Sequence, residues 1–243
     1  MAQFSGTCVL ITGGGSGIGL ATAKLFLQAG ARVAIAGRDK QKLDTAAKEL
    51  GGECLTTHAA DIADPAQAKS LVHAVEKQLG KIDILVNNAG TNVKERSFRQ
   101  LTPEVWQKLI RTNLDGAFYC IHAVFPGMAA RKNGLIININ SIAGKRATPL
   151  GGLAYAASKF GMTALGIGLG AEEKDSGIRV TNIYPGEVDT PILEFRPTPV
   201  TDEHRNRILR PEDIAGAVLY VAAQPPHVSI PELIIKPTWQ AYV

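Results

Sequence analysis

Short apolar runs alternate along the chain with longer segments in which apolar residues recur every three or four positions. The short runs are rich in Val, Ile, Leu and Ala, which is typical of strands buried on both faces. We therefore predict strands over residues 8–11, 31–36, 53–57, 82–86, 135–139, 179–183 and 233–235.

The longer segments have the period of amphipathic helices. Asp39 and the pair Asp64-Pro65 are typical helix starts, since Asp caps free N–H groups and Pro fits the first turn. The helices are predicted over residues 17–29, 40–50, 65–79, 103–110, 113–130, 153–174 and 211–222. This alternation predicts an α/β fold, doubly wound, with a mostly parallel sheet and helices on both faces.

Composition favours one globular domain over residues 1–243. Hydrophobic residues make up 45% of the chain and charged residues 20%, an ordinary balance. The formal net charge of +4 is small and the basic residues are scattered, so no nucleic-acid partner is expected. No apolar run is long enough for a membrane span.

The cysteines give no sign of a disulfide framework or a metal site. Cys8, Cys54 and Cys120 are odd in number and far apart, and the histidines are dispersed. Residues 1–7 lack the basic start of a signal peptide. We therefore expect no bound metal and a reducing, cytoplasmic location.

One long irregular stretch interrupts the pattern at residues 190–210. It contains Pro191, Pro197 and Pro199. Long irregular segments in compact domains are often lids or binding loops, so we expect a substrate lid here. An idle surface loop is the alternative.

A glycine cluster separates the first strand from the first helix. Residues 12–19 read Thr-Gly-Gly-Gly-Ser-Gly-Ile-Gly. A phosphate-loop NTPase is excluded because Leu20 and Ala21 follow where Lys and Ser/Thr are needed, and the strict G-x-G-x-x-G spacing also fails. The run fits T-G-x-x-x-G-x-G, which favours phosphate binding at a helix start. A tight turn without a ligand is the alternative.

Four more motifs lie at the carboxyl ends of predicted strands or in the helices that follow. In open α/β sheets this edge is where ligands bind. The motifs are Asn87-Asn88-Ala89-Gly90, Ser141, Tyr155-x-x-x-Lys159, and Pro185-Gly186 with Thr190 just beyond.

With these motifs in this order, residues 5–225 resemble the short-chain dehydrogenase/reductase family, in its single-domain branch. The resemblance implies a Rossmann-type fold and a nicotinamide cofactor. It also implies hydride transfer between nicotinamide C4 and a carbonyl or secondary alcohol. A non-catalytic dinucleotide-binding sensor or scaffold of the same fold is the alternative.

The physical chemistry of the motif residues agrees with that activity. Tyr155 and Lys159 are four positions apart and share a helix face. A nearby ammonium lowers the pKa of a phenol, which suits Tyr155 to proton transfer to or from an oxygen of the substrate. Ser141 can hydrogen-bond the same substrate oxygen. The resemblance adds that Lys159 holds the nicotinamide ribose and that Asn113 keeps a water in a proton relay behind it.

The resemblance also assigns the residues that contact the cofactor. The predicted cofactor contacts are Gly13, Ser16, Gly17, Ile18, Gly19, Arg38, Asp61, Ile62, Asn88, Ala89, Gly90, Tyr155, Lys159, Pro185, Gly186, Val188 and Thr190. For Asp61, a role at the start of a helix is the alternative to cofactor binding.

The end of the second strand predicts the cofactor. In dinucleotide folds an acidic residue there binds the ribose 2′-hydroxyl of NAD. The family's acidic position corresponds to Gly37, and Arg38 follows, which suits the 2′-phosphate of NADP. NADP(H) is therefore favoured. NAD(H) is the alternative if Asp39 binds the ribose instead of capping a helix.

The substrate residues are expected after Ser141 and after Gly186. They are Ile142, Arg146, Thr148, Leu150 and Glu187, with Phe195 and Arg196 from the lid. Arg146 or Arg196 would suit a substrate carboxylate, or each is a surface charge. Residues 227–238 depart from the family's usual ending and resemble a branch that includes dehydrogenases of small β-hydroxy acids and β-hydroxy amino acids.

The resemblance further implies a homodimer or homotetramer. Its interface would use the helices predicted over residues 103–130 and 153–174. Phe118, Phe125, Leu165 and Leu169 are apolar positions there, and the same positions also fit an ordinary core.

Overall fold

Seven parallel strands form one sheet in the computed structural model, which describes residues 3–241. The strand order is β3-β2-β1-β4-β5-β6-β7, so it reverses between β1 and β4. A crevice opens at such a reversal, at the carboxyl ends of the strands. The strands are β1 (Cys8–Thr12), β2 (Arg32–Gly37), β3 (Leu55–Ala59), β4 (Ile84–Asn87), β5 (Gly134–Ile139), β6 (Ile178–Pro185) and β7 (Glu232–Ile235).

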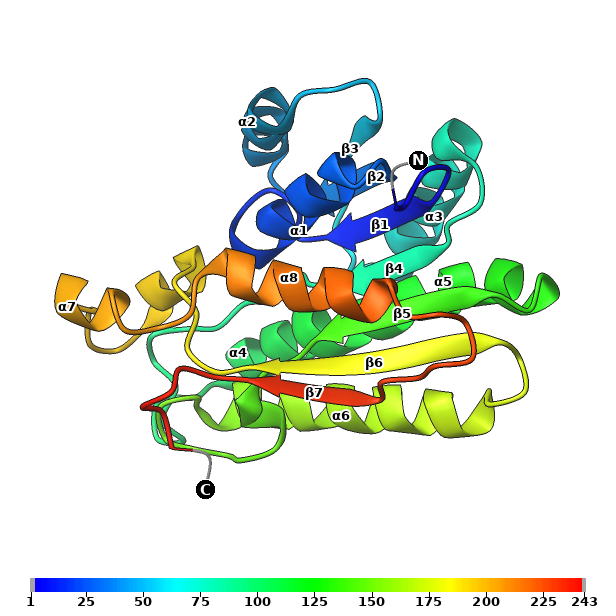
Figure 1. Cartoon of the computed structure of the whole chain (residues 1–243). Helices are drawn as coiled ribbons and strands as arrows, with labels where there is room; N and C mark the ends of the chain where they lie inside the picture. Colours follow the sequence, from blue (N-terminus) through cyan, green and yellow to red (C-terminus); the bar gives the residue numbers. More distant parts are fainter. Residues whose placement is uncertain (1–2, 242–243) are drawn as a thin grey trace.

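Helices cover both faces of the sheet, as the sequence predicts (Figure 1). Two predicted caps are confirmed: Asp39 accepts from the Lys42 N–H at 3.1 Å, and Asp64 accepts from the Ala66 N–H at 2.8 Å. The helices are α1 (Gly17–Gln28), α2 (Lys40–Leu50), α3 (Pro65–Leu79), α4 (Pro103–Ile110), α5 (Gly116–Ala130), α6 (Leu153–Glu172), α7 (Asp202–Arg205) and α8 (Pro211–Ala222).

The core consists of two apolar clusters, one on each face of the sheet. Strand β1 contributes Val9 and Ile11 to the cluster beneath α1 and α8, and Leu10 to the cluster beneath α3 and α5. This alternation follows from the two-residue period of a strand. Because both faces are covered, the central strands are buried and mostly apolar, which explains why they could be recognised in the sequence.

Two sequence predictions need correction. The helices expected over 103–110 and 113–130 are not separated, because a π-helical turn at Arg111–Asp115 joins α4 directly to α5. The stretch 190–210 is not wholly irregular, since it holds a 3-10 turn at Pro191–Phe195 and the short helix α7. Such short turns lack the repeated apolar period that reveals longer helices.

The apolar positions named for an oligomer interface divide into two groups. Phe118 is 45% exposed, whereas Phe125, Leu165 and Leu169 pack against the core cluster. Within residues 3–241, no helix is long and apolar enough to cross a membrane, and no His, Cys, Asp and Glu side chains gather as a metal site.

Candidate active site

A cavity of about 660 Å³ lies at the carboxyl edge of the sheet and gathers the motifs found in the sequence. Every residue predicted to contact cofactor or substrate lines this cavity, except Gly17 and Gly19. Of the four predicted catalytic residues, Ser141, Tyr155 and Lys159 line it and Asn113 does not. The motifs are therefore assembled in one place although they are scattered along the chain.

The glycine loop is fixed against the end of β4. The side-chain amide of Asn88 donates to the carbonyl oxygens of Thr12 and Gly13, each at 3.0 Å. A Cβ on Gly19 would lie 2.4 Å from the Gly13 oxygen, so only glycine fits there. Gly19 thus shapes the loop from outside the cavity.

The start of α1 opens into the cavity without a side-chain cap. Ser16 is its N-cap residue, but the Ser16 side chain accepts no capping hydrogen bond. Helices α2, α3 and α4 are capped in this way by Asp39, Asp64 and Thr102. Free N–H groups at the positive end of a helix suit a phosphate, so the loop fits the pyrophosphate of a dinucleotide.

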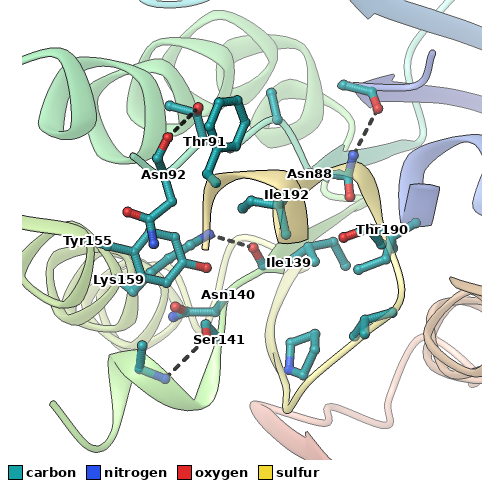
Figure 2. Close-up of a pocket in the computed structure, with 18 of the residues that line it drawn as sticks. Asn88, Thr91, Asn92, Ile139, Asn140, Ser141, Tyr155, Lys159, Thr190 and Ile192 are labelled. Carbon is teal, nitrogen blue, oxygen red and sulfur yellow. Dashed lines mark hydrogen bonds between the residues drawn. The ribbon is translucent and has the colours of Figure 1, made fainter. Parts of the chain in front are cut away.

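Tyr155, Lys159 and Ser141 form the centre of the site (Figure 2). Tyr155 and Lys159 lie on α6, with the ammonium 5.8 Å from the centroid of the Tyr155 ring. Lys159 is buried and donates to the carbonyl oxygen of Ile139 at 2.9 Å. In Figure 2 these side chains face Thr190 and Ile192 across the pocket.

Burial controls the proton equilibria of this centre. Loss of solvent raises the pKa of Tyr155, and this outweighs the opposite effects of a Ser141 hydrogen bond and of the Arg96 charge. Burial also lowers the pKa of Lys159 to about 7. The Tyr155 phenol therefore keeps its proton at neutral pH, which suits donation to a carbonyl oxygen.

Asn113 lies behind the centre, in the π-helical turn. Its side chain is fully buried and accepts from the Thr91 N–H at 2.8 Å. It also donates to the Thr91 carbonyl oxygen at 3.0 Å and to the Ser158 hydroxyl at 3.1 Å. Asn113 thus braces the segment after β4 against α6. The water relay expected of it stays a prediction.

Two predicted substrate residues meet in an ion pair. The Glu187 carboxylate lies 2.9 Å from the Arg196 guanidinium and 2.5 Å from the His204 ring. No motif in the sequence pointed to His204. Arg146 lies at the exposed rim, where it donates to the Lys145 carbonyl oxygen at 3.0 Å. Asp39 caps α2, and Asp61 lines the cavity while it accepts from the Ala63 N–H at 3.0 Å.

Other lining residues were missed by sequence reasoning. Lys42 follows Arg38 by four positions at the start of α2, a spacing that could have revealed it. Asn92 and Arg96 lie on the loop between β4 and α4, and Gln240 comes from the C-terminal segment. None of these three belongs to a recognisable local motif.

This chain is similar to known proteins over nearly its whole length. An uncharacterized oxidoreductase of Staphylococcus haemolyticus is 33% identical over 237 residues, 98% of this chain and all of the relative. A serine dehydrogenase structure, a closed form complexed with NADP+, has a TM-score of 0.89 and 32% identity over 97% of each chain. A 3-ketoacyl-(acyl-carrier-protein) reductase from Brucella melitensis, complexed with NADH, has a TM-score of 0.87 and 30% identity over 96% of this chain and 97% of its own.

The family model described as short chain dehydrogenase matches residues 7–199, from the start of β1 to the segment beyond β6. This span contains the glycine loop, Ser141, Tyr155 and Lys159. The chain therefore belongs to the short-chain dehydrogenase/reductase family of oxidoreductases.

Proposed function

We propose that the protein transfers a hydride between nicotinamide C4 and a carbonyl or secondary alcohol substrate, with NADP(H) as the preferred cofactor. The observation that carries this proposal is the meeting of Tyr155, Ser141 and Lys159 in the cavity into which the uncapped start of α1 opens. When bound, the nicotinamide supplies or accepts the hydride, so the protein's task is to position and polarise the substrate.

Tyr155 acts as the general acid in reduction and the general base in oxidation. The Ser141 hydroxyl stabilises charge on the same substrate oxygen. A charged Lys159 favours the phenolate form of Tyr155. Burial lowers the pKa of Lys159 to about 7, so the Lys159 side chain can gain or lose a proton near neutral pH. Asn113 holds Thr91 and Ser158 in place behind this group.

The preference for NADP(H) rests on the charges at the end of β2. Gly37 has no side chain to repel a 2′-phosphate, and Arg38 and Lys42 line the same end of the cavity. Asp39 is the acidic residue that would bind the ribose of NAD(H), but its carboxylate caps α2. Solved relatives include one complexed with NADP+ and one complexed with NADH, which supports a nicotinamide cofactor of either kind.

Residues 190–210 serve as the substrate lid in this proposal. Phe195 and Arg196 of this segment line the cavity, and Arg205 pairs with Asp189. The indole N–H of Trp239 donates to the Arg207 carbonyl oxygen at 2.7 Å, so the C-terminal segment lies against the lid. A homodimer or homotetramer is also proposed, and exposed Phe118 on α5 is a residue for its interface.

The decisive test measures oxidation of NADPH with small ketones and oxo acids, and reduction of NADP+ with β-hydroxy acids. Hydroxy acids are included because of the C-terminal resemblance and because one structural neighbour is a serine dehydrogenase. Tyr155→Phe should lower kcat by roughly 10²–10⁴-fold, the usual contribution of general acid–base catalysis. NADPH binding should persist.

Tyr220→Phe is the matched control, because Tyr220 lies 58% exposed on α8, outside the cavity lining. Equal turnover by wild type and Tyr155→Phe would refute the mechanism. Tight NADPH binding without turnover of any substrate would favour the sensor or scaffold alternative.

A further inference from the structure

Arg96 is a buried cation in the wall of the active-site cavity. It lies on the loop between β4 and α4, and only 8% of it is exposed. Its aliphatic part packs on Gly152, where a Cβ would lie 2.7 Å from the Arg96 Cβ. Gly152 precedes α6, the helix that carries Tyr155. The guanidinium is therefore held firmly on the substrate side of the centre.

Within residues 3–241, backbone carbonyl groups and no carboxylate receive the hydrogen bonds of Arg96. Its Nε donates to the Val93 oxygen at 2.8 Å, its Nη1 to the Leu150 oxygen at 2.7 Å, and its Nη2 to the Phe195 oxygen. A guanidinium has five N–H donors, so each terminal nitrogen keeps one for another acceptor. Two oxygens of one carboxylate match this pair of donors.

No acidic side chain in the described lining is available to neutralise this charge. The acidic residues there are Asp61 and Glu187. Glu187 is paired with Arg196 and His204, and the Asp61 carboxylate accepts from the Ala63 N–H, in the segment before α3.

The surroundings make the charge of Arg96 unfavourable in the free protein. Burial is the larger cause that lowers its pKa, and the positive charge of Arg196 acts in the same direction. A guanidinium nevertheless stays protonated in proteins. Buried charges are stable when they are paired, so an anion bound at Arg96 would relieve this cost.

We propose that Arg96 binds a carboxylate of the substrate, so that the protein acts on hydroxy acids and the corresponding oxo acids. This inference rests on the proposed function. In oxidation, the C–H bond of the alcohol carbon breaks and its electron pair passes with the hydrogen to nicotinamide C4. The hydroxyl proton passes to Tyr155 in its phenolate form, and NADP+ becomes NADPH. Arg96 remains unchanged and holds the acid end of the molecule.

Arg96 also connects the proposed carboxylate site to the lid, residues 190–210. Its partner Phe195 lies within residues 190–210, while Leu150 lies on the loop before α6. A carboxylate on Arg96 would therefore contact the residue that joins these two walls of the cavity. Neutral ketones lack this contact.

The test compares 2- and 3-hydroxy acids of four carbons with their methyl esters, which keep the secondary alcohol and lose the charge. In wild type, kcat/KM for the best acid should exceed that for its ester about 10- to 150-fold, the effect of one charge-assisted hydrogen bond. Arg96→Gln should remove this difference by raising KM for the acid far more than KM for the ester. Arg96→Lys should restore part of it.

Arg99→Gln is the control, because Arg99 is exposed on the same loop and outside the cavity lining. Its acid-to-ester ratio should equal that of wild type. NADPH binding, followed by cofactor fluorescence, checks that each variant is folded.

Three outcomes would overturn the inference. Equal use of acids and esters by wild type removes the need for an anion site, whatever the variants do. Equal loss of both substrates in a folded Arg96→Gln variant indicates a structural role alone. If wild type turns over neither acids, esters nor ketones, the proposed function fails together with the carboxylate site. Turnover of neutral ketones without preference for acids refutes only the carboxylate site.

Discussion

Cofactor preference should reverse when Gly37→Asp is combined with Arg38→Leu. A Cβ on Gly37 would approach nothing closer than the Leu43 side chain at 3.7 Å, an ordinary contact. The backbone at Gly37 is also outside the left-handed region, so the aspartate fits without strain. Its carboxylate would accept from a ribose 2′-hydroxyl and would repel a 2′-phosphate.

The magnitude follows from the position of Arg38. A charge-assisted hydrogen bond contributes about 1.5–3 kcal/mol, or about 10- to 150-fold in affinity. Arg38 is exposed, so salt screens its charge and the lower part of this range is expected. Lys42 lines the same cavity and adds attraction for the phosphate, which the double variant keeps.

The assay is kcat/KM for NADPH and for NADH with one saturating carbonyl substrate. Wild type should favour NADPH, and the double variant should favour NADH with similar kcat, because Tyr155 is untouched. Lys40→Leu is the control: Lys40 pairs with Asp44 at 2.8 Å and is outside the cavity lining. A wild-type preference for NADH would refute the argument and return the ribose-binding role to Asp39.

Two further predictions concern stability. Asn88→Ala should lower the free energy of unfolding by about 1–3 kcal/mol, because it leaves the carbonyl oxygens of Thr12 and Gly13 without their donor; an unchanged midpoint in urea would contradict this. Burial lowers the pKa of Lys159 from 10.5 to about 7. Between these values the unfolded chain binds more protons than the folded one, so Lys159 makes the unfolding free energy rise with pH, by up to about 1.4 kcal/mol per pH unit. The cofactor-free Lys159→Met variant should lack this part of the rise, and identical pH profiles would refute the assignment.

The fold could be predicted because its main signals are local. Central strands such as β1 and β5 are buried at every position and mostly apolar, and the helices α2 and α3 begin at capping aspartates. The least accurate strand was β3, predicted at 53–57 and found at Leu55–Ala59. It is an edge strand with polar residues, so its sequence lacks the apolar run that marks the others.

The site could be predicted where its residues belong to short sequence motifs. The glycine loop and the Tyr155–Lys159 pair each lie within eight residues, so spacing alone identifies them. Arg96 has no such signal, because it is separated from Leu150 by 54 positions and from Phe195 by 99. Its burial exists only once three loops meet, and no pattern along the chain could reveal that.

The basic side chains that line the cavity differ in their position and in their partners. Arg38 and Lys42 come from the β2–α2 region, where the cofactor's phosphates are expected. Arg196 has a carboxylate partner in Glu187, so it adds little net attraction for an anion. In the described part of the chain, Arg96 has only carbonyl groups as hydrogen-bond partners, and it lies close enough to Tyr155 to oppose the rise in the pKa of Tyr155. A substrate carboxylate at Arg96 would cancel part of that effect, so the Tyr155 phenol would hold its proton more tightly while such a substrate is bound.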